Sequence, residues 1–194
     1  MKTTKKALLL ALCAVLLVVS TVFATLAYLT STTEVVKNTF TAGNVTITLD
    51  EAKVDEYGKE VAGAARVTEN EYKLIPGHTY TKDPTIHVDA NSEDCWVFAK
   101  LVNGLGTNAT ITIDKDKWAQ VATTADGGVV YAYNTKMTAG DSVALFNEFT
   151  FAQNANPENY KDVSITIIGY AVQADGFGTA AEAWAAAPAS WTTN

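Results

Sequence analysis

The feature that most constrains the fold of this chain is a series of short segments in which apolar and polar residues alternate. In the first of them, Val45, Ile47 and Leu49 alternate with threonine and aspartate, the pattern of a strand with one buried face. Alternation or an apolar bias predicts further strands at residues 96–102, 110–113, 129–133, 142–146 and 163–172. Glycine-rich breaks separate them without intervening amphipathic helices, so the sequence predicts an all-β fold, an antiparallel β-sandwich of jelly-roll type.

Two stretches predict turns. Residues 50–66 are charged and contain glycine, which favours a loop or an irregular hairpin with Tyr57 and Gly58 near its tip. Residues 71–94 read as strand, turn, strand and loop. Pro76-Gly77 suits a type II turn, because proline fixes φ and glycine accepts a positive φ. Pro84 is expected to open the next strand, since a proline inside a sheet removes a ladder hydrogen bond.

One short helix is predicted near the C-terminus. Thr179 and Glu182 are spaced as a capping box, alanines follow, and Pro188 ends the pattern. Because so short a helix is marginal by itself, we expect it to dock on the β domain through Trp184.

The first 27 residues have the pattern of an export signal. Lys2, Lys5 and Lys6 precede an apolar run from residue 7 to residue 27 that ends in small residues, which is typical of a secretory signal peptide and its helix. Cleavage would follow Ala24 or Ala27. The run is also long enough to span a bilayer, so a retained membrane anchor is the alternative.

Charge and cysteine content exclude some classes of protein. The chain of 194 residues carries a net charge of −7, and removing the first 27 residues removes three lysines and no acids, which leaves 11 basic against 21 acidic residues. Such an acidic surface argues against nucleic acid binding. Cys13 lies in the apolar run, so the mature chain would keep Cys95 alone and could form no internal disulfide. Cys95 is expected to be a packed core thiol, with a reactive role as the alternative.

Several segments together resemble one family of proteins. TLA at residues 25–27 is followed by Tyr28, a polar spacer, NTF at 38–40, AGN and VTITL; PGHTYTKDP and AVQADGF come later. These segments resemble the TasA/camelysin family. The resemblance implies secretion by a Gram-positive bacterium, a SipW-type signal peptidase as processing partner, and cleavage marked by Thr25, Ala27 and Tyr28. It also implies β-sandwich subunits that assemble into extracellular fibres.

The predicted organisation has four parts. Residues 1–27 form the signal peptide, residues 28–44 the mature N-terminal segment, residues 45–178 the β-sandwich domain, and residues 179–194 a short helix and tail. The segment after the cleavage point is rich in serine, threonine and β-branched residues. It is either a flexible linker or a donor strand that pairs with the next subunit, with Tyr28, Val35 and Phe40 setting the register.

Catalytic motifs are absent from the sequence. His78 lies in the Pro-Gly turn, and His87 alternates with Ile86 and Val88, so it should face outward or across to a neighbouring strand. Neither histidine belongs to an HExxH zinc motif, and no nucleophile elbow, phosphate-binding loop or dinucleotide fingerprint is present. We therefore expect no catalytic residues and no cofactor. The peptidase activity attached to the camelysin name has no support in these residues.

An acidic loop is the one candidate metal site. Asp89, Asn91, Glu93 and Asp94 offer hard oxygen ligands of the kind calcium accepts, but the loop lacks the glycine and final glutamate of an EF-hand. A solvated turn is the alternative reading.

These observations predict a secreted, non-enzymatic cell-surface or biofilm-matrix protein that forms fibres by donor-strand addition. Its partners would be the SipW-type signal peptidase and further copies of itself, with membrane contact only through an uncleaved signal. A monomeric surface module that binds carbohydrate is the alternative, in which Trp96, Trp118, Tyr131 and Tyr133 would line a sugar-binding face instead of filling the core. A metallopeptidase would need three convergent ligands around a histidine.

Overall fold

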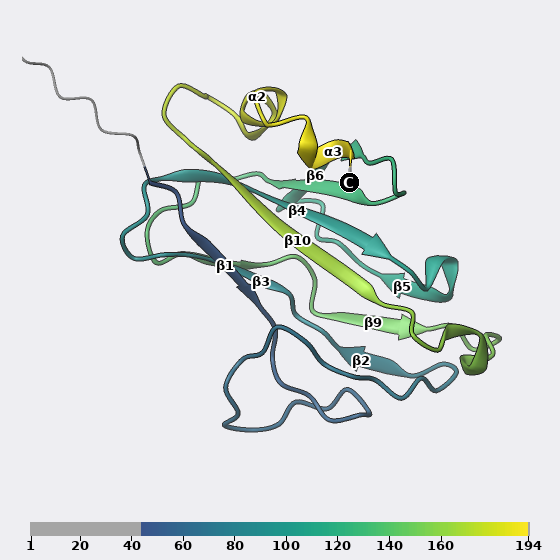
Figure 1. Cartoon of the computed structure of the whole chain (residues 1–194). Coiled ribbons are helices and arrows are strands. Elements are labelled where there is room, and N and C mark those ends of the chain that lie inside the picture. Colours follow the sequence, from purple (N-terminus) through teal and green to yellow (C-terminus); the bar gives the residue numbers. More distant parts are fainter. Residues whose placement is uncertain (1–43, 194) are drawn as a thin grey trace, which may run out of the picture. The chain divides into compact units, whose positions relative to one another are not determined.

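The computed structural model describes residues 44–193 (Figure 1). The predicted signal peptide lies outside the described residues. So do the predicted processing and assembly residues Thr25, Ala27, Tyr28, Val35 and Phe40.

The described residues form ten strands in three antiparallel sheets (Figure 1). The first sheet has the order β1 (Ile47–Asp50), β3 (Thr85–Val88), β8 (Ser142–Ala144). The second has the order β10 (Ile165–Gln173), β4 (Cys95–Asn103), β7 (Val129–Tyr133), β6 (Trp118–Thr123). The third has the order β2 (Thr79–Thr81), β9 (Glu148–Phe151), β5 (Ala109–Ile111). The predicted antiparallel all-β class is therefore confirmed.

One apolar core joins the first sheet to the second. It contains Ile86 and Val88 of β3 together with Val97, Ala99 and Leu101 of β4. Gly169 of β10 packs against the first sheet, since a Cβ there would meet the Cδ1 atoms of Ile47 in β1 and Ile86 in β3, both at 3.4 Å. The side chains of the two sheets therefore interdigitate, and β1 and β10 lie side by side (Figure 1).

Two further clusters complete the core. On the other face of the second sheet, Phe98 and Val130 pack against α2 (Ala180–Ala185) and α3 (Ser190–Thr193). Trp184 of α2 lies 5.1 Å from Phe98 between ring centroids, which confirms the expected docking. The third sheet has its own cluster, centred on Tyr80, Phe149 and Phe151. Short 3-10 helices lie at the rim of this sheet, at Gly106–Asn108 and Pro157–Tyr160.

The turns follow the local chemistry. His78 N–H donates to Ile75 O at 3.1 Å and Gly77 has φ of 76°, which is the type II turn predicted for Pro76-Gly77. Pro84 immediately precedes β3, as expected. Thr179 Oγ1 accepts from Glu182 N–H at 3.2 Å, while Glu182 Oε2 accepts from Gly178 N–H and not from Thr179. The reciprocal half of the capping box is thus shifted by one residue.

The strands of the structure differ from the predicted ones in three places. Residues 71–75 form no strand, although Tyr72 and Leu74 pack against the third cluster. Strands β6 and β9 were not predicted. In β6 a register shift between Gln120 and Ala122 breaks the alternation. The strand expected at residues 142–146 ends at Ala144 as β8. β9 follows it after a short break.

Candidate functional site

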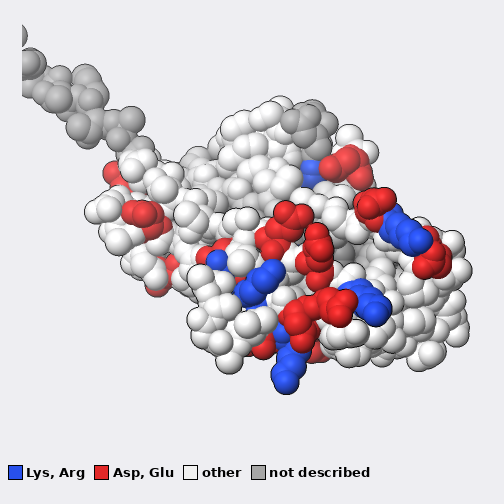
Figure 2. All heavy atoms as spheres, turned by 60° about the horizontal axis from the view of Figure 1, so that its bottom comes forward, with Lys and Arg blue, Asp and Glu red and all other residues white. Residues whose placement is uncertain are grey.

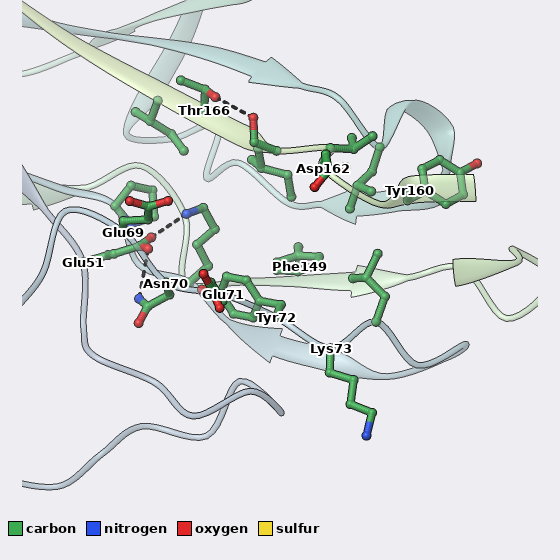
Figure 3. A pocket seen from close by; sticks show the side chains of 18 of the residues that line it. Glu51, Glu69, Asn70, Glu71, Tyr72, Lys73, Phe149, Tyr160, Asp162 and Thr166 are labelled. Carbon is green, nitrogen blue, oxygen red and sulfur yellow. Dashed lines mark hydrogen bonds and ion pairs between the residues drawn. The ribbon is translucent and has the colours of Figure 1, made fainter. Parts of the chain in front are cut away.

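A groove of about 1330 Å³ lies beside β1 and β10, which are the end strands of the first two sheets. It is lined by the end of β1 and the segment that follows it, by residues 68–74, by residues 157–163 and by the start of β10. Figure 3 shows Glu51, Asn70 and Tyr72 on one side of it, with Asp162 and Thr166 on the other. We call it the edge groove.

The edge groove is flanked by two strands that are each paired on one side. β1 pairs with β3 and is the end strand of its sheet, and β10 pairs with β4 and is the end strand of the other. Each of these strands therefore has a second edge of backbone N–H and C=O groups available for pairing.

The hydrogen bonds at the two ends of β10 show which of its backbone groups point away from β4 and have no backbone partner among residues 44–193. Gly104 N–H donates to Ser164 O at 3.0 Å, and Ala174 N–H donates to Asp94 O at 2.8 Å. The register between these bonds is continuous, and bonded and non-bonded pairs alternate along an antiparallel ladder. The even-numbered residues of β10 therefore bond to β4. The odd-numbered ones direct N–H and C=O away from it: Ile165, Ile167, Gly169, Ala171 and Gln173.

The same rule applies to β1 and shows where its edge is closed. Asp89 N–H donates to Thr46 O at 2.9 Å, so even-numbered residues bond to β3 and Ile47 and Leu49 face the other edge. Glu51, the next odd-numbered residue, exchanges two hydrogen bonds with Val67, at 2.7 and 2.8 Å. The free edge of β1 is therefore short, and that of β10 is the longer one.

The inner wall of the edge groove is apolar. Phe149 and Leu105 are buried, and Tyr72 packs edge-on against Phe149 and Tyr80, with ring centroids 5.4 and 5.6 Å apart. Burial, followed by the nearby charges of Glu51 and Asp83, raises the pKa of the Tyr72 hydroxyl. Apolar side chains of an added chain could therefore be buried here.

The rim of the edge groove is acidic. Six acids line the groove against three lysines, so the electrostatic potential favours a cationic group. Figure 2 shows acidic side chains gathered over the middle of one face of the molecule with basic ones between them.

A buried ion pair lies in the wall next to β1. Glu51 is 4% exposed, and its Oε2 is 2.5 Å from Lys82 Nζ. Its Oε1 accepts from Asn70 Nδ2 at 2.9 Å. Sequence reasoning missed this group, because the three residues lie in a loop, a strand end and an irregular segment with no shared spacing.

His87 bridges the three strands of the first sheet. Its Nε2 is 2.9 Å from Asp50 Oδ1 on β1, and its Nδ1 is 2.7 Å from Ser142 Oγ on β8. This confirms the expectation that it faces across to a neighbouring strand. Arg66 binds the same Asp50 carboxylate and also Asp83. Burial by itself would raise the pKa of Asp50, but the hydrogen bonds of Arg66 and His87 outweigh it and lower that pKa. These polar side chains therefore link the strands of the first sheet to one another.

His78 and Cys95, which the sequence analysis also considered, make packing and hydrogen-bond contacts typical of structural residues. His78 Nε2 is 2.9 Å from the Tyr57 carbonyl, and its ring packs edge-on against Tyr80. Cys95 is fully buried in the core, and burial, with Asp94 and Asp141 nearby, raises its pKa to about 11, as fits a packed thiol.

The predicted calcium ligands lie in the turn between β3 and β4. Asp89 Oδ1 accepts from the backbone and side chain of Asn91, and Asp94 pairs with Lys136 at 2.7 Å. Within residues 44–193, no three His, Cys, Asp or Glu side chains gather in a way that could hold a metal ion. The calcium site stays a prediction, and the geometry adds nothing to it.

The aromatic residues considered for a sugar-binding face are packed. Trp118 is 2% exposed and donates from Nε1 to Ala144 O, and Trp96 is 8% exposed and donates to Phe177 O. Tyr131 and Tyr133 are half-buried against the core between the first two sheets. The four rings therefore form no exposed platform.

Comparison of the chain with protein-family models, curated proteins and solved structures finds no match. Among the helices that the structure describes, none has the length and apolar character needed to cross a bilayer.

Proposed function

We propose that this chain is a secreted, non-enzymatic structural protein of the cell surface or biofilm matrix, of the TasA/camelysin type. Its domain is a β-sandwich of jelly-roll type, and its subunits join by strand addition into fibres. The core shared by the first two sheets supports the sandwich, since two layers that bury one face each are held by such interdigitation.

The observation that carries the proposal is the pair of free strand edges beside one groove. Five residues of β10 and two of β1 direct backbone groups toward a side that no strand of residues 44–193 pairs with. An extended chain added there would gain main-chain hydrogen bonds along β10 and bury alternate side chains against the apolar wall.

The occupant we propose is the segment 28–42 of a second copy. Its fifteen residues span about 50 Å when extended, whereas the nine residues of β10 span about 30 Å, so enough chain remains to reach its own domain. Cleavage after Ala27 would also give Tyr28 a cationic amino group, which suits the acidic rim of the groove. A head-to-tail contact of this kind generates filaments and not closed pairs.

The proposal is tested by comparing the mature chain, residues 28–194, with a chain that lacks residues 28–40. Negative-stain electron microscopy and size-exclusion chromatography should show filaments for the first and folded monomers for the second. Filaments from the shortened chain would refute donor-strand addition. A mature chain that stays monomeric at every concentration would do the same. N-terminal sequencing of the secreted protein checks the cleavage after Ala27, without which no free donor end exists.

A further inference from the structure

Three side chains meet in the wall of the edge groove in an arrangement that offers covalent chemistry. The Glu51 carboxylate contacts the Lys82 amine with one oxygen, at 2.5 Å, and the Asn70 amide with the other, at 2.9 Å (Figure 3). The side chains of Lys82 and Glu51 are 10% and 6% exposed. A single buried carboxylate therefore touches both a nucleophilic amine and a carboxamide.

The Asn70 amide makes two further hydrogen bonds besides the one to Glu51. Its Nδ2 also donates to Ala52 O at 2.8 Å, and its Oδ1 accepts from Val54 N–H at 3.1 Å. The backbone N–H of Val54 is therefore placed where negative charge would develop on Oδ1 if a nucleophile attacked the Cγ carbon.

We propose that Lys82 and Asn70 become joined by an intramolecular isopeptide bond, with Glu51 as the catalytic acid and base. Glu51 takes a proton from the Lys82 ammonium, and the neutral Nζ attacks Asn70 Cγ. The tetrahedral oxyanion on Oδ1 is held by Val54 N–H. Glu51 then protonates Nδ2 and takes the second proton from Nζ, the Cγ–Nδ2 bond breaks, and ammonia leaves as the Nζ–Cγ amide forms. One amine and one carboxamide give one amide and one ammonia, so no oxidant, reductant or metal is required.

Aromatic side chains cover the site. Tyr72 lies over the site, with its ring centroid 6.0 Å from Lys82 Nζ, and packs against Phe149. The product would close the loop from residue 70 to residue 82 around the Pro76-Gly77 turn. This inference is independent of the fibre proposal.

Intact-mass spectrometry of the purified, folded protein tests the proposal directly. The expected mass is that of the sequence less one ammonia, and a tryptic digest should contain one branched peptide that links Asn70 to Lys82, with no cleavage after Lys82. Full sequence mass together with cleavage after Lys82 would overturn the proposal. Loss of ammonia confined to the Asn70-Glu71 peptide, as in a succinimide, would overturn it as well.

Substitutions of the three residues test the role of each in the reaction. Glu51→Gln keeps the shape of the side chain and removes the base, and it should abolish the link. Lys82→Arg keeps the cation and should also restore the full mass, so the result does not depend on how well Glu51→Gln folds. Asn70→Asp should still form the link but lose water in place of ammonia. A link that survives in Glu51→Gln, or no change of leaving group in Asn70→Asp, would contradict the mechanism.

Discussion

Lys100 carries a buried charge on the face of the second sheet that packs against the helices. The side chain is 1% exposed, and its Nζ lies 2.7 Å from Asp126 Oδ2. The hydrogen bond from Lys100, followed by one from Thr124, lowers the pKa of Asp126 to about 2 from an ordinary 3.8. Because the folded pKa is depressed, the pair stabilises the fold above the unfolded pKa. That stabilisation is lost as the pH falls from about 4 through about 2.

Lys100→Met should therefore flatten the fall of Tm between about pH 4 and about pH 2, because Asp126 would then titrate near its ordinary value. At neutral pH the Tm should be unchanged or higher, since an apolar side chain of similar volume replaces a buried charge. Thermal unfolding followed by circular dichroism measures both effects. Lys136→Met is the control, because it removes an ion pair to Asp94 that is about half exposed and should change little. An unchanged acid slope in Lys100→Met would contradict this account.

Gly58 combines a positive φ with a close approach to another segment. Its φ is 77°, and a Cβ there would lie 2.9 Å from the Tyr80 Cα. Gly63 has nearly the same φ, 75°, with no atom near its would-be Cβ. Gly63→Ala should cost about 1 kcal/mol from backbone conformation alone. Gly58→Ala should cost about 1–3 kcal/mol more, since the backbone at Tyr80 must move. Equal losses in urea unfolding would show that the contact with Tyr80 is unimportant.

At the scale of single elements, helix α2 depends on its cap. Thr179 Oγ1 satisfies the Glu182 N–H, and the helix has only six residues. Thr179→Ala should destabilise the protein by about 1 kcal/mol, whereas Thr179→Ser keeps the acceptor oxygen and should cost a few tenths at most. Guanidinium unfolding of the two variants gives the comparison. Equal stabilities would mean that the docking of Trp184 holds the helix without its cap.

Strand β10 offers a sharper test of the free edge. Ile167→Pro removes an N–H that faces away from β4, so the β4 ladder should survive while pairing with an added strand is blocked. We expect the domain to remain folded by circular dichroism and filament formation to fall at least tenfold. Ile167→Ala loses apolar side chain but keeps the N–H, and it should still assemble. If the two variants assemble equally well, the β10 edge is not the acceptor.

Strands with a clean alternation could be predicted from the sequence, and others could not. The strand at residues 129–133 was predicted with the observed bounds. Its alternate side chains pack against two different apolar clusters, so each face of the strand leaves a regular signal in the sequence. β6 has a register shift that destroys the alternation, and the apolar residues near Tyr72 pack without any ladder partner. The candidate site was largely beyond prediction. Which edge of β10 is free depends on the strand order. The contact of Glu51 with Lys82 and Asn70 depends on how three segments distant in sequence fold together.

At the scale of the whole molecule, the fibre proposal rests on three features: the predicted export signal, the segment that its cleavage would free, and the edge groove as acceptor. In the proposed fibre, the net negative charge would oppose association of the subunits until strands pair. The proposed pairing is directional because its donor and its acceptor are different parts of the chain. The predicted order is therefore cleavage, release and then polymerisation.

The most direct test of the acceptor groove is amide hydrogen exchange of assembled mature protein against the chain that lacks residues 28–40. The account predicts that Ile165, Ile167, Gly169 and Ala171 become protected on assembly, while the even-numbered amides of β10 are protected in both states because they bond to β4. The contrary result would be fast exchange of these four amides in the filaments, with the new protection located at another strand edge such as that of β6 or β8.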